Sequence, residues 1–202
     1  MGETIHARRT VLPKRLVAPG PDEAACAEIF GAAAAAPDHG QLLPWRFVRV
    51  PESRRAVLAD VFEQALLERD AEALPAQRAR AREKAFRAPT LALLIVDGAR
   101  GDPAIDLHER LISAGCAVQN VLLMATAMGW GSALTSGKAM TSRVLRACFA
   151  LAPGEHAVCF VNLGQVASQH PARPRPALPD YMTVLGDFGM VAAPPMAAST
   201  LD

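Results

Sequence analysis

One long uncharged stretch constrains the fold of this chain more than any other feature. Between Leu111 and Gly137 the sequence contains no Lys, Arg, Asp or Glu. We expect the longest helix over residues 104–128, with a charged first part and only apolar or small residues on every face after it. A helix that is apolar all round has to be buried all round. Because one sheet covers only one side of such a helix, the pattern predicts that a second copy of the chain covers the other.

The same stretch is long enough to cross a bilayer, and a membrane span is the alternative reading. Gln119 and Asn120 in the stretch, and a turn-and-strand pattern in its last third, favour a buried helix instead. Arg8-Arg9 resembles the start of a twin-arginine export signal, but Pro13-Lys14-Arg15 interrupts the apolar segment that such a signal needs. We therefore expect a cytoplasmic protein with no membrane partner.

Net charge and cysteine spacing argue against nucleic-acid-binding and metal-binding proteins. The formal net charge is +1, so no overall field draws the chain onto nucleic acid. No two of the four cysteines have a metal-ligand or redox spacing, and no His/Cys metal set is present. We expect no nucleic-acid partner, no metal and four reduced core cysteines, which are Cys26, Cys116, Cys148 and Cys159.

The order of apolar segments predicts an α+β fold. Strands are expected over residues 45–50, 90–96, 130–135 and 158–163, and the last is a nearly continuous apolar run, as in the centre of a sheet. Helices are expected after Asp22, from Glu52 and after Thr141 or Ser142. No G-x-G-x-x-G turn opens a helix, which argues against a dinucleotide-binding α/β domain.

Two segments do not fit a core. The basic, polar run Gln77–Lys84 has too little apolar surface, so we expect it on the surface or as a mobile lid. Residues 186–202 form a loose C-terminal tail, which leaves residues 1–185 as one domain.

Four clusters are suited to hold a flat, polar, anionic ligand. Arg8-Arg9-Thr10 offers guanidinium groups and a hydroxyl for a phosphate or a ring carbonyl, although a solvated helix end is the plainer reading. The Ala36–Phe47 loop carries His39, which alternatively bonds a nearby carbonyl. Small residues in Gly129–Gly137 let backbone N–H groups approach a ligand, and prolines space two arginines along His170–Pro176.

These clusters contain no obvious nucleophile. No Ser–His–Asp order and no pair of carboxylates stands out in the sequence. Ligand-holding groups without a nucleophile are typical of a protein whose chemistry is supplied by a cofactor.

Taken together, four motifs resemble the nitroreductase family, and most closely its small bacterial single-domain members. They are Arg8-Arg9-Thr10, the stretch from Ala36 to Phe47, Ser113–Gln119 and Gly129–Ser132, within a match over roughly residues 5–180. The resemblance implies a mostly antiparallel central sheet flanked by helices, and an intertwined homodimer with one FMN in each of two interface sites. It also implies a ping-pong reaction in which NADH or NADPH reduces the flavin, and a nitroaromatic, quinone or similar small acceptor then takes two electrons.

The resemblance assigns the flavin contacts by position. Arg8, Arg9 and Thr10 correspond to the residues that bind phosphate, ribityl and ring oxygen, and Arg9 would stabilise the reduced flavin. His39 corresponds to a loop residue that reaches the flavin from the partner chain. The complete set of expected cofactor-binding residues is Arg8, Arg9, Thr10, His39, Leu43, Leu134, Thr135, Ser136, Arg173 and Arg175.

Two of these positions depart from the family pattern. Leu43 stands where the family often has a Gln that bonds the flavin ring, so a polar contact there has to come from backbone or from Gln41. Thr135 stands where some relatives have an arginine, for which Arg173, Arg175 or Lys138 would compensate. The alternatives are therefore other flavin chemistry on the same fold (dehalogenation, enoyl reduction), a non-catalytic flavin-binding dimer, or a protein without flavin.

Overall fold

The computed structural model describes residues 2–168 and 174–185. The chain divides into two compact units, Met1–Gln169 and His170–Asp202. In the second unit the described residues contain one 3-10 turn, η7 (Leu178–Asp180). The expected tail, residues 186–202, lies outside the described residues. All strands and the remaining helices belong to the first unit.

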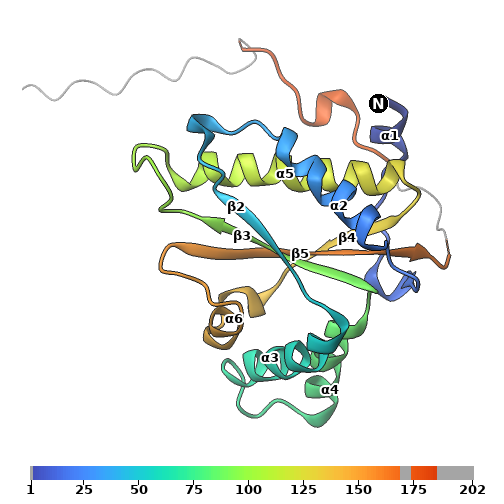
Figure 1. Cartoon of the computed structure of the whole chain (residues 1–202), viewed down its shortest axis with the longest axis vertical. Coiled ribbons are helices and arrows are strands. Elements are labelled where there is room, and N and C mark those ends of the chain that lie inside the picture. Colours follow the sequence, from blue (N-terminus) through green and yellow to red (C-terminus); the bar gives the residue numbers. More distant parts are fainter. Residues whose placement is uncertain (1, 169–173, 186–202) are drawn as a thin grey trace, which may run out of the picture. The chain divides into compact units, whose positions relative to one another are not determined.

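A five-stranded antiparallel sheet forms the centre of the first unit (Figure 1). Its strands are β1 (Leu16–Val17), β2 (Trp45–Arg49), β3 (Thr90–Asp97), β4 (Gly131–Thr135) and β5 (Glu155–Val166). The long strand β5 pairs with β1, β3 and β4, which confirms its predicted central place. The α+β class and all four predicted strands are thus confirmed, whereas the two-residue strand β1 was missed.

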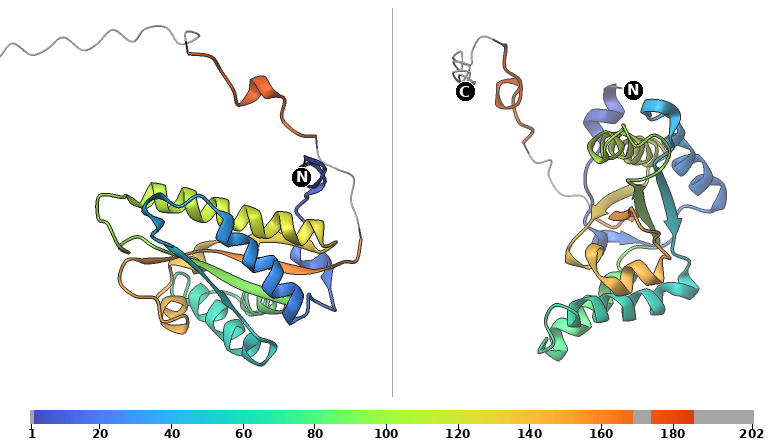
Figure 2. Two further views of the ribbon diagram at one scale, coloured as in Figure 1. Left: turned by 45° about the horizontal axis from the view of Figure 1, so that its top comes forward. Right: turned by 90° about the vertical axis from the view of Figure 1, so that its left-hand side faces the viewer.

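Helices cover both faces of this sheet (Figures 1 and 2). On one face lie α2 (Glu23–Gly31) and α5 (Leu107–Ala127), and on the other lie α3 (Arg55–Leu67), α4 (Pro75–Glu83) and α6 (Arg143–Cys148). Strand β3 supplies both layers, because successive side chains of a strand point to opposite faces. Leu94 and Val96 join the α5 layer, and Leu91, Leu93 and Ile95 join the α3 layer.

The helix ends follow the expected capping chemistry. The Asp22 carboxylate accepts a hydrogen bond from the Ala25 amide at 2.8 Å, and the Ser142 hydroxyl accepts one from Leu145. Of the two residues expected to cap α6, Ser142 is therefore the cap. The shorter elements are α1 (Gly2–Ala7), η1 (Pro13–Arg15), η2 (Ala32–Ala35), η3 (His39–Gln41), η4 (Glu52–Arg54), η5 (Lys84–Phe86) and η6 (Lys138–Thr141).

The basic segment after Pro75 is a helix, which the sequence reasoning missed. Helix α4 buries Ala81 against the α3 layer. One small apolar residue is thus enough to pack this helix, although the sequence pattern contains no stripe of large apolar residues. Arg78 and Arg82 donate hydrogen bonds to the Glu63 carboxylate of α3 at 2.6 and 2.7 Å. These contacts fix the segment on α3.

Helix α5 is buried on one face only within the chain. Ala117 and Val121 pack against the sheet, whereas Ile112 is 66% exposed and Leu111, Gly115 and Gln119 are also exposed. The expectation of burial on every side is therefore not met by a single copy. Among the described residues, α5 is also the one helix long and apolar enough to cross a membrane, a test that core helices pass as well.

The cysteines divide into two classes. Cys26 and Cys159 are buried, and burial raises the pKa of the Cys159 thiol to about 11. Cys116 is half-buried and Cys148 is exposed, so the expectation of four core cysteines is wrong for these two. Cys148 falls at the end of α6, where only Leu145 is fully buried.

Candidate functional site

A cavity of about 630 Å³ opens in the first unit, between α3, α4 and the end of β4. Its volume lies within the range of roughly 300–1,000 Å³ that is usual for small-molecule sites. Buried apolar side chains of α3, β3, η6 and β5 form much of its lining. They are Phe62, Ala65, Leu66, Leu91, Met140 and Phe160.

Hydroxyl groups at the end of β4 line the same cavity. Thr135 and Ser136, both predicted from the sequence, are among its lining residues. The buried Asn162 side chain donates a 3.0 Å hydrogen bond to Thr135 Oγ1, which leaves the hydroxyl proton of Thr135 available to a ligand. Leu134 does not line the cavity and is 40% exposed, because alternation along the strand turns it to the other face. The sequence did not identify Asn162 as a site residue, because it lies within the mostly apolar run of β5.

Basic side chains surround the cavity. The sequence indicated Lys138 as a compensating charge beside Thr135 and Gln77–Lys84 as a lid, but it did not single out Arg69, Arg80, Lys84 or Arg87. The lining residues include five cations and no Asp or Glu. The cations are Arg69, Arg80, Lys84, Arg87 and Lys138. Their signal was present in the sequence, because residues 80, 84 and 87 follow the i, i+4, i+7 spacing of one helix face.

The charge of this lining affects Lys84. Burial, and next the positive charges of Arg87 and Arg69, lower the pKa of the Lys84 ammonium. Among residues 2–168 and 174–185, no carboxylate pairs with Arg69, Arg80, Lys84 or Lys138. The cavity therefore holds positive charge that its own walls do not neutralise.

The N-terminal basic cluster lies beside β4. Helix α1 ends at Ala7, and Thr10 then forms a parallel bridge with Ser132. The Val11 amide donates a 2.9 Å hydrogen bond to the Ser132 carbonyl, and the next residue, Leu12, lines the cavity. The structure thus brings Arg8-Arg9-Thr10 together with the strand that ends at Thr135.

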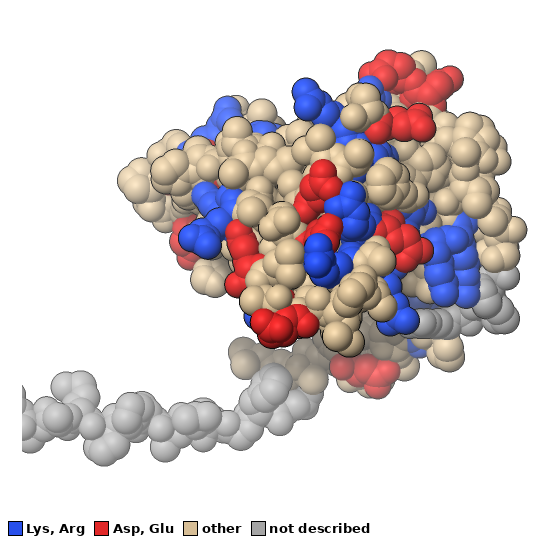
Figure 3. Space-filling model, turned by 90° about the horizontal axis from the view of Figure 1, so that it is seen from below, with Lys and Arg blue, Asp and Glu red and all other residues tan. Residues whose placement is uncertain are grey.

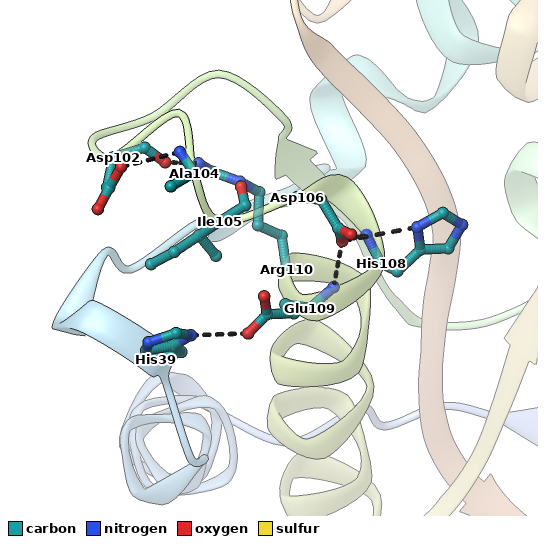
Figure 4. A network of polar contacts seen from close by, with 8 residues as sticks. All are labelled: His39, Asp102, Ala104, Ile105, Asp106, His108, Glu109 and Arg110. Atoms are coloured by element: carbon teal, nitrogen blue, oxygen red, sulfur yellow. Dashed lines mark hydrogen bonds and ion pairs between the residues drawn. The ribbon is translucent and has the colours of Figure 1, made fainter. Parts of the chain in front are cut away.

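The histidine loop lies at the first turn of α5 (Figure 4). His39 Nδ1 is 2.7 Å from Glu109 Oε2, and the Leu43 amide donates a 2.6 Å bond to the Asp38 carboxylate. Gln41 and Leu43 both have a positive φ, of 50° and 47°. Side-chain-bearing residues rarely adopt this region, and such conformations concentrate at functional sites.

The two halves of the predicted site are at opposite ends of α5. His39 contacts the first turn of this helix, whereas Thr10 contacts β4, which starts after its last turn. A helix of 21 residues is about 30 Å long. One chain therefore does not bring His39 and Leu43 to Arg8-Arg9-Thr10. Arg175 lies in the second unit, and Arg173 lies outside the described residues.

Comparisons with known proteins agree with this architecture. The model of the nitroreductase family matches residues 5–165. A Haemophilus influenzae protein named "Putative NAD(P)H nitroreductase" is 32% identical over 155 residues, which cover 75% of this chain and 81% of that protein.

Solved structures show the same fold. A nitroreductase-like family protein from Bacillus cereus superposes with a TM-score of 0.76 at 17% identity, covering 92% of this chain and 95% of that one. A nitroreductase with bound FMN from Bacteroides fragilis gives 0.68 at 20% identity, covering 91% and 97%. The chain belongs to the nitroreductase family of oxidoreductases.

Proposed function

We propose that the protein is an FMN-dependent oxidoreductase that takes hydride from NADH or NADPH and reduces a nitroaromatic, a quinone or a similar flat acceptor. The observation that carries this proposal is the cavity at the end of β4, which combines an apolar lining, two hydroxyl groups and unneutralised positive charge. A flat ring fits the apolar lining and the hydroxyl groups, and the positive charge favours reactants that carry an anionic group. Family membership and the FMN-bound structural relative support the choice of cofactor.

The residues present fit FMN. Arg8, Arg9 and Thr10 would hold its phosphate and ribityl groups through charge-assisted hydrogen bonds. Thr135 and Ser136 would face the ring, with the Thr135 proton directed to an acceptor by Asn162. When bound, FMN supplies the hydride acceptor and passes two electrons to the second substrate. The chain would orient the reactants, exclude water and hold the positive charge of Arg9 near the reduced ring.

The site would be completed by a second copy of the chain. Leu111, Ile112 and Gly115 form an exposed, uncharged face on α5. Two α5 helices packed antiparallel through this face would bring the start of one helix to the end of the other. His39 and Leu43 of one copy would then approach Arg8-Arg9-Thr10 of the other. This homodimer is proposed as the form present in the cytoplasm.

Anaerobic spectroscopy separates the two half-reactions. We expect the purified protein to be yellow, and its absorbance near the flavin maximum to be bleached by one equivalent of NADH or NADPH. After removal of the nicotinamide, one equivalent of a nitroaromatic or quinone should restore the colour, because a ping-pong cycle needs no ternary complex. A colourless protein, or a yellow protein that no nicotinamide bleaches, would contradict the proposal. Reoxidation by halophenols or enones alone would favour the alternative chemistries.

A further inference from the structure

We propose that four basic residues at the cavity bind an anionic group, a phosphate or a carboxylate, on the reactant that meets the flavin. They are Arg69, Arg80, Lys84 and Lys138, here called the basic rim. The basic rim would select NADPH over NADH through its additional phosphate, or carboxylated acceptors over neutral ones. This inference rests on the proposed oxidoreductase function and deepens it.

The two faces of α4 differ in whether their basic side chains are paired with acids. On one face, Arg78 and Arg82 are neutralised by Glu63, and Arg82 also pairs with Asp60. Seen from the side of α3 and α4, blue and red side chains alternate in the middle of the surface (Figure 3). The other face of the same segment presents Arg80 and Lys84 to the cavity, whose lining contains no acid.

The electrostatic consequence is a local excess of charge in a chain that is nearly neutral overall. The protein has 21 basic and 20 acidic residues, so acids are abundant yet absent from this lining. Like charges held around a partly enclosed space repel one another more strongly than in open water. A bound anion would relieve this repulsion. Burial lowers the pKa of Lys84 first, and the positive charges of Arg87 and Arg69 lower it further.

The basic rim is separate from the groups assigned to the cofactor phosphate. Arg8 and Arg9 are not among the cavity-lining residues, and Thr10 beside them contacts β4 at Ser132. Thr135 is the last residue of β4, and it lines the cavity together with Ser136. The basic rim is thus available to a second anion, and arginine and lysine are the residues that recognise phosphate and carboxylate groups.

Charge-removing variants test the proposal, with a matched control on the same helix. Arg80→Gln and Lys138→Gln each remove one charge of the basic rim, and Arg78→Gln removes one charge from the paired face of α4. Calorimetry of NADP⁺ and NAD⁺ binding to the FMN-loaded protein gives one selectivity ratio. The second is the ratio of kcat/KM for 4-nitrobenzoate and 4-nitrobenzamide, which differ in charge.

We expect at least one of the two ratios to fall about tenfold in both rim variants, as for the loss of one charge-assisted hydrogen bond. A fall in the nucleotide ratio identifies the NADPH phosphate, and a fall in the acceptor ratio identifies a carboxylate. Unchanged ratios, or an equal change in Arg78→Gln, would overturn the proposal. Loss of FMN from the rim variants would also overturn it, because the basic rim would then hold the cofactor. Calorimetry measures nucleotide binding without turnover. A protein that binds nucleotide but does not reduce an acceptor would therefore contradict the proposed function and not the role of the basic rim.

Discussion

Replacing Arg8 and Arg9 together with Ala is expected to yield a colourless protein. Each guanidinium would donate charge-assisted hydrogen bonds to the phosphate or to a ring oxygen of FMN, and such bonds contribute about 1.5–3 kcal/mol apiece. Losing both should weaken FMN binding by a factor of about 100 or more. The flavin content of the purified variant and its Kd for added FMN, followed by quenching of flavin fluorescence, measure the effect.

Arg54→Ala with Arg143→Ala provides the control for this experiment. Both residues are exposed, neither lines the cavity, and neither lies in the segments at the two ends of α5 that carry the proposed flavin contacts, so this pair removes the same net charge outside the proposed site. We expect the control protein to retain its FMN. If the Arg8/Arg9 variant purifies fully yellow, these arginines do not hold the cofactor.

Arg110→Met is expected to produce the largest loss of stability. Although it is charged, Arg110 is only 1% exposed, and its guanidinium donates to backbone carbonyls of the loop before α5 (Figure 4). The acceptors include Ile105 at 2.9 Å and Asp102 at 2.8 Å, together with Arg100 and Asp97. Methionine fills a similar volume but donates no hydrogen bond, so these carbonyls lose their partners. We expect the free energy of unfolding to fall by about 3 kcal/mol, measured by urea denaturation.

Two comparisons make the Arg110 result specific. Arg143→Met changes a side chain that is 92% exposed and should alter stability by less than about 0.5 kcal/mol. Arg110→Lys keeps the charge but has fewer donors, and should fall between the two. Equal stability of Arg110→Met and the parent protein would show that the loop carbonyls are satisfied without this residue.

The centre of the sheet was predictable because strands β3 and β5 are built on nearly continuous apolar runs. Strand β5 could be placed at the centre of the sheet from Val158–Leu163 alone, and the caps of α2 and α6 follow from single side chains. Two elements were missed for a common reason. Strand β1 has two residues, and α4 buries Ala81 without a stripe of large apolar residues. Periodicity needs several large side chains to be visible.

The site was predictable in part, because local motifs indicate which residues bind a ligand but not which of them lie close together in the fold. The sequence indicated Thr135 and Ser136, and the structure places them in the cavity. Of the basic rim, Lys138 was expected beside Thr135, and Gln77–Lys84 was expected on the surface or as a lid. The complete rim was not predicted, because its members come from separate elements and meet only when α4 packs on α3. The separation of His39 from Thr10 could not be predicted from the sequence either. It arises because His39 contacts the start of α5, whereas Thr10 contacts the strand that follows the end of this helix.

Sedimentation velocity with simultaneous detection of protein and flavin absorbance tests the central proposal most directly. If the site is built from two copies, the flavin signal should move with a species of twice the 21.4 kDa chain mass and one flavin per chain. Dilution that dissociates the dimer should release the flavin in parallel. A yellow species with the mass of a single chain would contradict a site shared between two copies.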